Sequence, residues 1–246
     1  SRPRTREEIF FPRGEASYLS GDYDEAIRNL RRSIAALPSD PRPYYRLVDS
    51  YAAKGIPDSA EQVLRGFLQS DPRNACAHYG LGCLALKRQD LEAALREAER
   101  ALMLDPQLGH ARLLLGSAHN QAGRPAEALK AWRKARSMFR AQRERIDEAW
   151  ALNRIALVQR QSGDLRKARR GFEEALALQG SVGDRQDQLV ILGNLGLTLA
   201  DLGDRERART VFEPTPPGTR STSTSAPTPG SRCGSASPCR RTSRSP

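Results

Sequence analysis

The chain has 246 residues, of which 38% are hydrophobic and 6% aromatic, and it contains no apolar run long enough to cross a membrane. Its formal net charge is +11, but five of these charges are arginines of residues 214–246, and basic residues elsewhere alternate with acidic ones. This composition argues against an integral membrane protein and against a nucleic-acid-binding surface. With no signal peptide visible, we expect a cytoplasmic location, although the chain starts at Ser1 rather than Met.

One short phrase recurs six times, and in each copy a glycine or glutamine stands five residues before an alanine. The first four alanines are spaced by 34 residues and the last two follow at intervals of 40. Such a period predicts stacked helical hairpins, and therefore an all-α, right-handed superhelical solenoid. The repeated pairs are Gly21 with Ala26, Gly55 with Ala60, Gln89 with Ala94, Gly123 with Ala128, Gly163 with Ala168, and Gly203 with Ala208.

The spacing divides the chain into units. After an N-terminal extension at residues 1–6, we expect an array over 7–213 with units at about 7–40, 41–74, 75–108, 109–142, 149–182 and 189–213, the last one truncated. The clearest copy places Gly82 on the first helix and Ala94 on the second, where small residues allow close helix crossing. A turn glycine supplies the left-handed backbone between the helices. The first unit departs from this pattern at Pro12 and Arg13, so it is either a frayed cap or a false start.

These residues resemble the tetratricopeptide repeat, with Leu-Gly on the first helix, Gly-Asp-x-x-x-Ala at the turn and a proline after the second helix. Gly116 and Gly196 match the Leu-Gly position, as Gly82 does. The last two units are similar to the longer repeats of kinesin light chains and Pins-type adaptors, through Gly183-Asp184-Arg185 and Asn194-Leu195-Gly196. In that variety the asparagine before Leu-Gly hydrogen-bonds the backbone of a peptide ligand. Asn194 matches it, whereas the preceding unit has Arg154 there and Asn153 one position away.

The concave groove of such an array is formed by one face of the first helices. On this basis the candidate peptide-binding residues mix aromatic and hydrogen-bonding side chains: Arg42, Tyr45, Asp49, Tyr79, His110, Asn120, Trp150, Asn153, Arg154 and Asn194. The alternative is that Tyr79 or Trp150 simply covers a joint between helices. The lysines and asparagines with which one subclass of the family holds chaperone tails are missing.

No motif points to catalysis, a metal or a cofactor. The cysteines lack Cys-x-x-Cys spacing, and Cys76 and Cys83 are too far apart along one predicted helix for a disulfide. The sequence has no phosphate-binding glycine loop, His-Glu-x-x-His or serine elbow, so we expect no enzyme activity.

From Pro214 onward the sequence lacks acidic, aromatic and large aliphatic residues, so it cannot bury a core. We expect a disordered tail at 214–246, which is either functional or the product of a reading-frame error in a longer bacterial repeat protein. The sequence favours a scaffold or adaptor that binds a protein or peptide segment. The alternatives are the regulatory arm of a multidomain kinase, transcription regulator or protease, and an array that self-associates through its incomplete ends.

Overall fold

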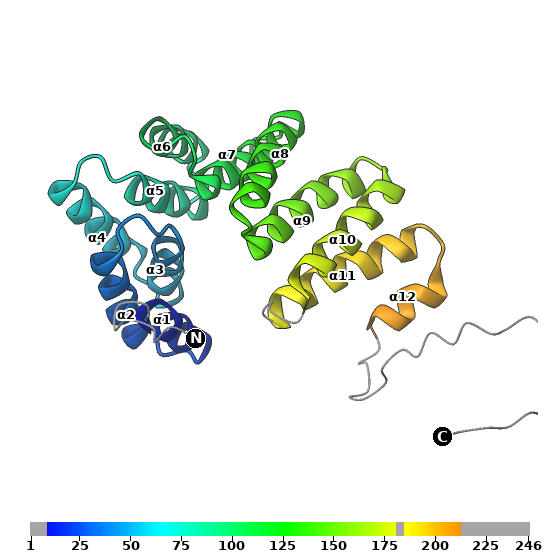
Figure 1. The fold of residues 1–246 in the computed structure, drawn as a ribbon, viewed down its shortest axis with the longest axis horizontal. Helices are drawn as coiled ribbons and strands as arrows, with labels where there is room; N and C mark the ends of the chain where they lie inside the picture. The colour runs from blue at the N-terminus through cyan, green and yellow to red at the C-terminus, as the bar shows by residue number, and fades with distance from the viewer. Residues whose placement is uncertain (1–8, 181–184, 213–246) are drawn as a thin grey trace, which may run out of the picture. The chain divides into compact units, whose positions relative to one another are not determined.

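The computed structural model describes residues 9–180 and 185–212, and within these ranges all regular structure is helical. The chain divides into residues 1–213 and 214–246, and the described helices all belong to the first part (Figure 1). The predicted extension at 1–6 and the predicted tail at 214–246 lie outside the described residues, as do Gly183 and Asp184. The described helices are α1 (Phe10–Leu19), α2 (Tyr23–Ala36), α3 (Arg42–Ala53), α4 (Pro57–Ser70), α5 (Ala75–Lys87), α6 (Leu91–Leu104), α7 (Gly109–Gln121), α8 (Pro125–Gln142), α9 (Arg145–Gln161), α10 (Leu165–Gln179), α11 (Arg185–Asp201) and α12 (Arg205–Phe212).

The helices form successive pairs, in which each odd-numbered helix packs on the even-numbered helix that follows it. Each even-numbered helix also contacts the first helix of the next pair, and α3, α5 and α7 contact one another in series. The predicted all-α solenoid of stacked helix pairs is therefore confirmed.

All six turns within the pairs have the same backbone conformation. In the first turn, the amide of Asp22 donates to the carbonyl of Ser17 at 2.9 Å, and Gly21 itself has a φ of +82°. This is the bonding pattern that ends a helix on a left-handed residue. At the third turn Gln89 adopts a φ of +61° although it carries a side chain.

Small residues lie where the two helices of a pair cross. The six turn alanines are all buried, five of them completely. Within the fourth pair, Gly116 of α7 is crowded by the ring of Trp132 of α8; at Gly82 of α5 a Cβ atom would come within 2.6 Å of a methyl carbon of Leu114 on α7, the first helix of the next pair. The hydrogen at these positions sets the separation of the helices.

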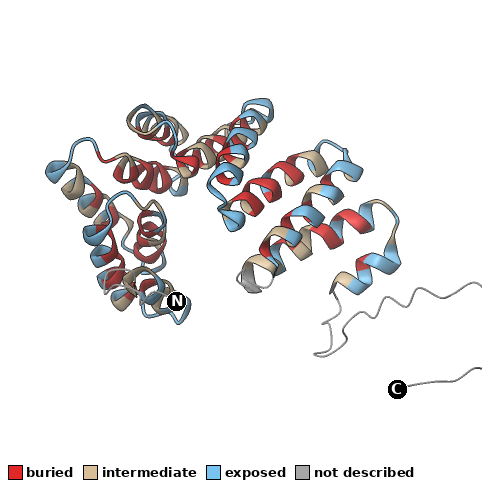
Figure 2. Cartoon of the chain, in the orientation of Figure 1, coloured by how far each residue is buried: buried red, intermediate tan, exposed pale blue. Residues whose placement is uncertain are grey.

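First and second helices are buried to different extents (Figure 2). Nine residues of α5 are buried, and they surround the helix, whereas α6 buries only Ala94, Ala98 and Ala101 along one stripe. A first helix is covered by its own partner and by both neighbouring pairs, while a second helix leaves one face in solvent. This difference follows from the order of contacts in the array.

The first pair is folded, although the sequence left its status open. Pro12 is the third residue of α1, where a backbone amide has no partner within the helix. Gly14 is buried against Leu30 of α2, as Gly116 is against Trp132 within the fourth pair. Glu15 of α1 also forms a 2.7 Å ion pair with Arg46 of α3. These contacts hold α1 on the array.

The six extra residues before the fifth pair lengthen two helices. α8 has 18 residues, against 14 in α6, and α9 has 17, against 13 in α7. Between them Arg143 adopts a φ of +62°, and the amide of Glu144 donates to the carbonyl of Phe139 at 2.9 Å. Helix α9 thus begins four residues before position 149, where the repeat spacing placed the unit.

Candidate functional site

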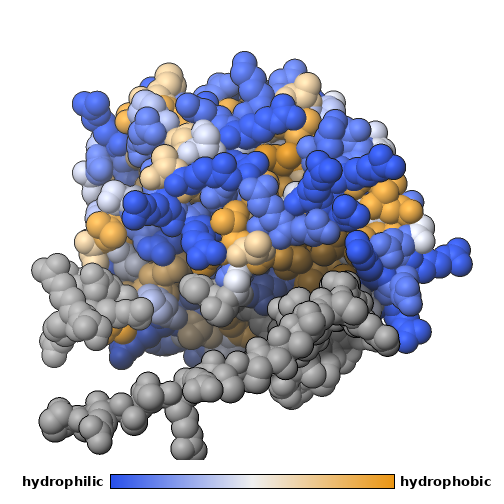
Figure 3. Space-filling view, turned by 45° about the vertical axis from the view of Figure 1, so that its right-hand side comes forward, coloured by the Kyte–Doolittle hydropathy of each residue, from blue (hydrophilic) through white to orange (hydrophobic). Residues whose placement is uncertain are grey.

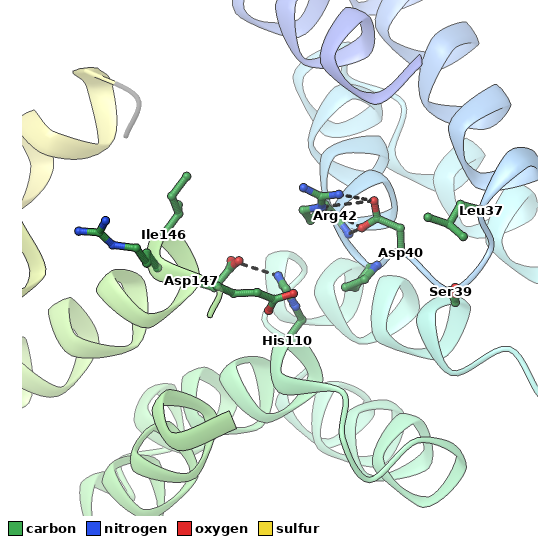
Figure 4. Close-up of a pocket in the computed structure, with 10 residues that line it drawn as sticks. Leu37, Ser39, Asp40, Arg42, His110, Ile146 and Asp147 are labelled. Atoms are coloured by element: carbon green, nitrogen blue, oxygen red, sulfur yellow. Dashed lines mark hydrogen bonds and ion pairs between the residues drawn. The ribbon is translucent and has the colours of Figure 1, made fainter. Parts of the chain in front are cut away.

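Two of the predicted groove residues, Arg42 and His110, border a hollow of about 420 Å³ (Figure 4). Three segments line it: residues 37 and 39–42, which run from the end of α2 to the first residue of α3, His110 at the start of α7, and residues 144–147 at the start of α9. The hollow therefore combines parts of the second, fourth and fifth helix pairs. Its chemistry is mixed, with three carboxylates, two guanidinium groups, an imidazole and the half-exposed side chains of Leu37 and Ile146.

Arg42 is held rigidly at one wall of the hollow. Its guanidinium forms a two-pronged ion pair with Asp40, with Nε–Oδ1 and Nη2–Oδ2 distances of 2.9 and 2.7 Å. The same group lies over the Phe11 ring, 4.9 Å from the centroid. Asp40 is almost fully covered, while over half of the Arg42 side chain remains exposed. A guanidinium oriented in this way offers unused donors to a ligand.

His110 joins three helix pairs at the base of the hollow. Its Nε2 lies 3.1 Å from a carboxylate oxygen of Asp147, and its ring makes edge contacts with Tyr79 of α5 and Phe139 of α8. Figure 4 shows the imidazole and the Asp147 carboxylate pointing toward each other. The predicted groove residue His110 is therefore a joint of the array as well as part of its surface.

Glu144 gives the hollow an acidic side. Partial burial raises the pKa of this carboxyl above its usual range, and the neighbouring negative charge of Asp147 raises it further, while His110 and Arg42 act in the opposite direction. A cationic group of a ligand would relieve this repulsion.

Tyr45 is the predicted aromatic anchor that remains accessible. It follows Arg42 by one helical turn on α3, and 42% of its surface is exposed. Arg46 lies over its ring at 5.8 Å. Burial of the hydroxyl end, followed by the nearby Asp49 carboxylate, raises the pKa of Tyr45 above its usual value, so the phenol stays protonated. The ring thus offers an apolar face to a ligand, while its hydroxyl is turned toward Asp49.

Three predicted groove residues are buried and serve the array instead. Asp49 is 6% exposed and forms a 2.6 Å ion pair with Lys87 of α5. Tyr79 is also 6% exposed and contacts His110. Asn153 is 2% exposed and accepts a hydrogen bond from Asn194 Nδ2 at 3.0 Å.

The remaining predicted residues are more accessible. Asn120 and Trp150 are half-buried, and Arg154 is exposed on α9. Asn194 is half-buried, but its amide already donates to Asn153, so a ligand would compete with this bond. The structure thus joins Arg42 with His110 across the hollow and Asn153 with Asn194 between the last two pairs.

Sequence reasoning missed the acidic residues of the hollow, Asp40, Glu144 and Asp147. The last two belong to the extra residues between the fourth and fifth units, which the repeat spacing left outside both. The change of spacing from 34 to 40 residues was the available signal, because an insertion in a regular array projects side chains that stacking does not use.

The described residues contain no group of three or more histidine, cysteine or acidic residues that could hold a metal ion. Cys76 and Cys83 are free and buried, while Cys233 and Cys239 lie outside the described residues. Among the helices of the described ranges, none is both long and apolar enough for a bilayer. The face in Figure 3 is mainly hydrophilic, with hydrophobic patches between the charged side chains.

Three family models of the tetratricopeptide repeat match the chain. One matches residues 18–79, a second matches residues 77–108, and a third matches two overlapping ranges, 108–181 and 147–213. Together these matches run from the first helix pair to the last described one. The chain therefore belongs to the tetratricopeptide repeat family. The likeness of its last two units to kinesin light chains stays a prediction.

Solved structures support the same fold. Pseudomonas aeruginosa PilF is 19% identical with a TM-score of 0.56, over 83% of this chain and 88% of that one. A tetratricopeptide repeat protein of Thermus thermophilus is 21% identical with a TM-score of 0.58, over 77% of this chain and 98% of that one. Yeast Tom70 is 16% identical with a TM-score of 0.57, over 85% of this chain and 43% of Tom70.

One curated relative matches part of the chain. Cellulose synthase operon protein C of Pseudomonas fluorescens strain SBW25 is 30% identical over 132 residues. The match covers 53% of this chain and only 10% of that protein.

Proposed function

We propose that this array is a protein-interaction scaffold that binds a peptide or protein segment along its first helices, with the hollow as the central contact. The observation that carries the proposal is the joint arrangement of an oriented guanidinium, the exposed Ile146 side chain and an acidic wall around a space of about 420 Å³, with the accessible ring of Tyr45 one helical turn beyond Arg42 on α3. Exposed aromatic and arginine side chains are the groups that most often dominate protein interfaces.

The contacts favour a ligand segment with both polar and apolar groups. Tyr45 and Ile146 offer apolar surface, and Arg42 has donors for a ligand carbonyl or carboxylate. Glu144 favours a lysine or arginine side chain nearby. A peptide in extended conformation presents these groups together with its backbone, which suits binding across several helices.

A displayed library of random peptides, selected on the immobilised full chain, supplies ligands with which to test the proposal. We expect selected peptides to bind Tyr45→Ala/Ile146→Ala at least about tenfold more weakly than the unmodified chain, because both side chains supply exposed apolar contact. Met103→Ala is the matched control, since Met103 is an exposed apolar side chain of α6, away from the hollow. Equal losses in both variants, or no loss in the double variant, would contradict the proposal.

A second candidate is that the array is one part of a longer regulatory protein. The match to a tenth of a much longer bacterial protein favours it. The genomic sequence on either side tests it, since in-frame coding sequence for a further domain is expected. An intact reading frame that starts and stops at the present ends would oppose it. In neither candidate does the array itself catalyse a reaction.

A further inference from the structure

Helix α11, which is the first helix of the last described pair, carries an exposed apolar face. Leu189, Val190 and Leu197 have 57%, 49% and 47% of their surface exposed. Between them a Cβ atom added to Gly193 would meet nothing within 4 Å, and Ala200 extends the exposed stripe. The residues 189, 190, 193, 197 and 200 form one side of the helix, here called the α11 end face.

The repeat register shows which interface this face continues. Counted from the turn glycines, Ala149, Asn153 and Leu157 of α9 correspond to Leu189, Gly193 and Leu197 of α11. In α9 these positions are covered: Ala149 is fully buried, and Asn153 accepts a hydrogen bond from α11. Leu157 packs into the cluster that contains Ile191 and Leu195 of α11. The α11 end face is therefore the continuation of an established interface between helix pairs.

The order of large and small side chains on the α11 end face differs from the order at the equivalent positions of the preceding pairs. In the fourth and fifth pairs the first of these positions is small, Gly109 or Ala149, and the second is larger, Leu113 or Asn153. In α11 the order is inverted, with Leu189 followed by Gly193. A surface with an inverted order of large and small residues suits a partner other than a further repeat stacked in the same way.

The part of this sequence that follows α12 is poor in large apolar side chains. Residues 214–246 contain no leucine, isoleucine, valine, methionine or aromatic residue. The α11 segment 188–200 carries no charged residue at all, like residues 75–86 of α5, a helix buried on most sides. Apolar surface of this kind gains free energy when covered, and it has no charges with which to select an unlike partner.

The stripe is also nearly symmetric about its centre. Leu189 and Leu197 lie four residues before and after Gly193. In an antiparallel helix pair with a two-fold axis at Gly193, Leu189 of each copy packs against Leu197 of the other, and the two glycines allow close approach. We propose that the α11 end face binds the same face of a second copy of this chain, which gives a two-fold symmetric dimer.

Sedimentation velocity of the full chain over about a hundredfold range of concentration tests this proposal. The weight-average mass is expected to approach twice the chain mass of 27.2 kDa at the upper end. Leu189→Asp/Leu197→Asp should weaken dimerisation at least about tenfold, because it buries four carboxylates per dimer. Met103→Asp, an equally exposed apolar position on α6, should leave the dimer intact. Circular dichroism verifies that both variants remain helical.

Cross-linking locates the axis independently of those variants. With Cys233 and Cys239 replaced by serine, Gly193→Cys treated with a short bifunctional thiol reagent should give dimers and no larger product. Met103→Cys should give none. A single-chain mass at every concentration would overturn the proposal, and so would a dimer unaffected by the α11 substitutions. A weight-average mass in sedimentation that rises beyond twice the chain mass would show head-to-tail assembly instead, and an added heterologous helix that binds α11 while the chain stays monomeric would assign the face to another partner.

Discussion

At Gly116 a single hydrogen atom decides how closely two helices cross. A Cβ atom there would lie 2.5 Å from Trp132 Cδ1, and the indole is 1% exposed, with Nε1 donating to the Leu113 carbonyl at 3.1 Å. Gly116→Ala should lower the free energy of unfolding by about 1–3 kcal/mol through this overlap. Gly66→Ala is the matched control, because Gly66 lies inside α4 with open space around it. Gly66→Ala should raise the free energy of unfolding by up to about 1 kcal/mol, because alanine has a higher helix propensity than glycine. Urea unfolding of both variants measures the difference, and two changes of the same sign would refute the role of Gly116.

Gln89 carries a backbone cost that the other five turns avoid. Its φ of +61° lies in the left-handed region, where a side chain is unfavourable. Gln89→Gly should therefore stabilise the chain by about 0.5–1 kcal/mol. Gly123→Gln, the reverse change at an uncrowded turn with φ of +71°, should destabilise it by a similar amount. Thermal melts distinguish these outcomes, and a Gln89→Gly variant with a lower melting temperature than the parent would be inconsistent with the strain.

The buried thiols should react slowly. Burial raises the pKa values of Cys76 and Cys83 to about 12, from an ordinary value of 9.0. Because only the thiolate reacts, at pH 9 about a thousandth of each folded thiol is reactive, against half of an unperturbed one. In a Cys233→Ser/Cys239→Ser background, alkylation at pH 9 should be at least about a hundredfold slower in the native chain than in urea. The shift also implies that stability falls as pH rises from 9 toward 12, since the unfolded thiols ionise first. Comparable native and unfolded alkylation rates would contradict the burial.

At the scale of helices, the extra residues of the fourth and fifth pairs create a charged junction. Glu148 of α9 is 4% exposed, and its carboxylate lies 2.7 Å from Arg140 Nη2 and 3.5 Å from Arg136 Nε. Both arginines belong to α8 and also pair with Glu174 of α10. The two arginines of α8 therefore connect the buried carboxylate of α9 with the exposed carboxylate of Glu174 on α10.

Replacing the buried Glu148 should lower the free energy of unfolding more than replacing the exposed Glu174. Glu148→Ala should lower the free energy of unfolding by about 2–3 kcal/mol, since a buried carboxylate that accepts from arginine is lost. Glu174→Ala, whose side chain is 45% exposed, should cost less than about 1 kcal/mol. Guanidinium unfolding of the two variants provides the comparison. Equal effects would mean that the junction contributes as a surface network only.

The sequence could predict features that neighbouring residues determine. A glycine five residues before an alanine fixes both the left-handed turn and the helix crossing, so the helix pairs follow from local pattern. The hollow could not be predicted, because it depends on how stacking brings residues 39–42 near residues 144–147. The burial of Asp49 and Asn153 was also hidden, since their partners Lys87 and Asn194 belong to other repeats. A face assigned by helical periodicity alone does not show which of its residues the neighbouring pair covers.

In the whole array, the hollow is the surface that we propose receives a ligand. Hydrogen–deuterium exchange of the full chain, with and without a peptide selected as above, tests this most directly, because amide protection reports where a bound segment covers or rigidifies the backbone. We predict slower exchange in residues 37–46 and 143–150 on binding, with α4 and α6 unchanged. Protection confined to α4 and α6, or to α11 alone, would contradict the account.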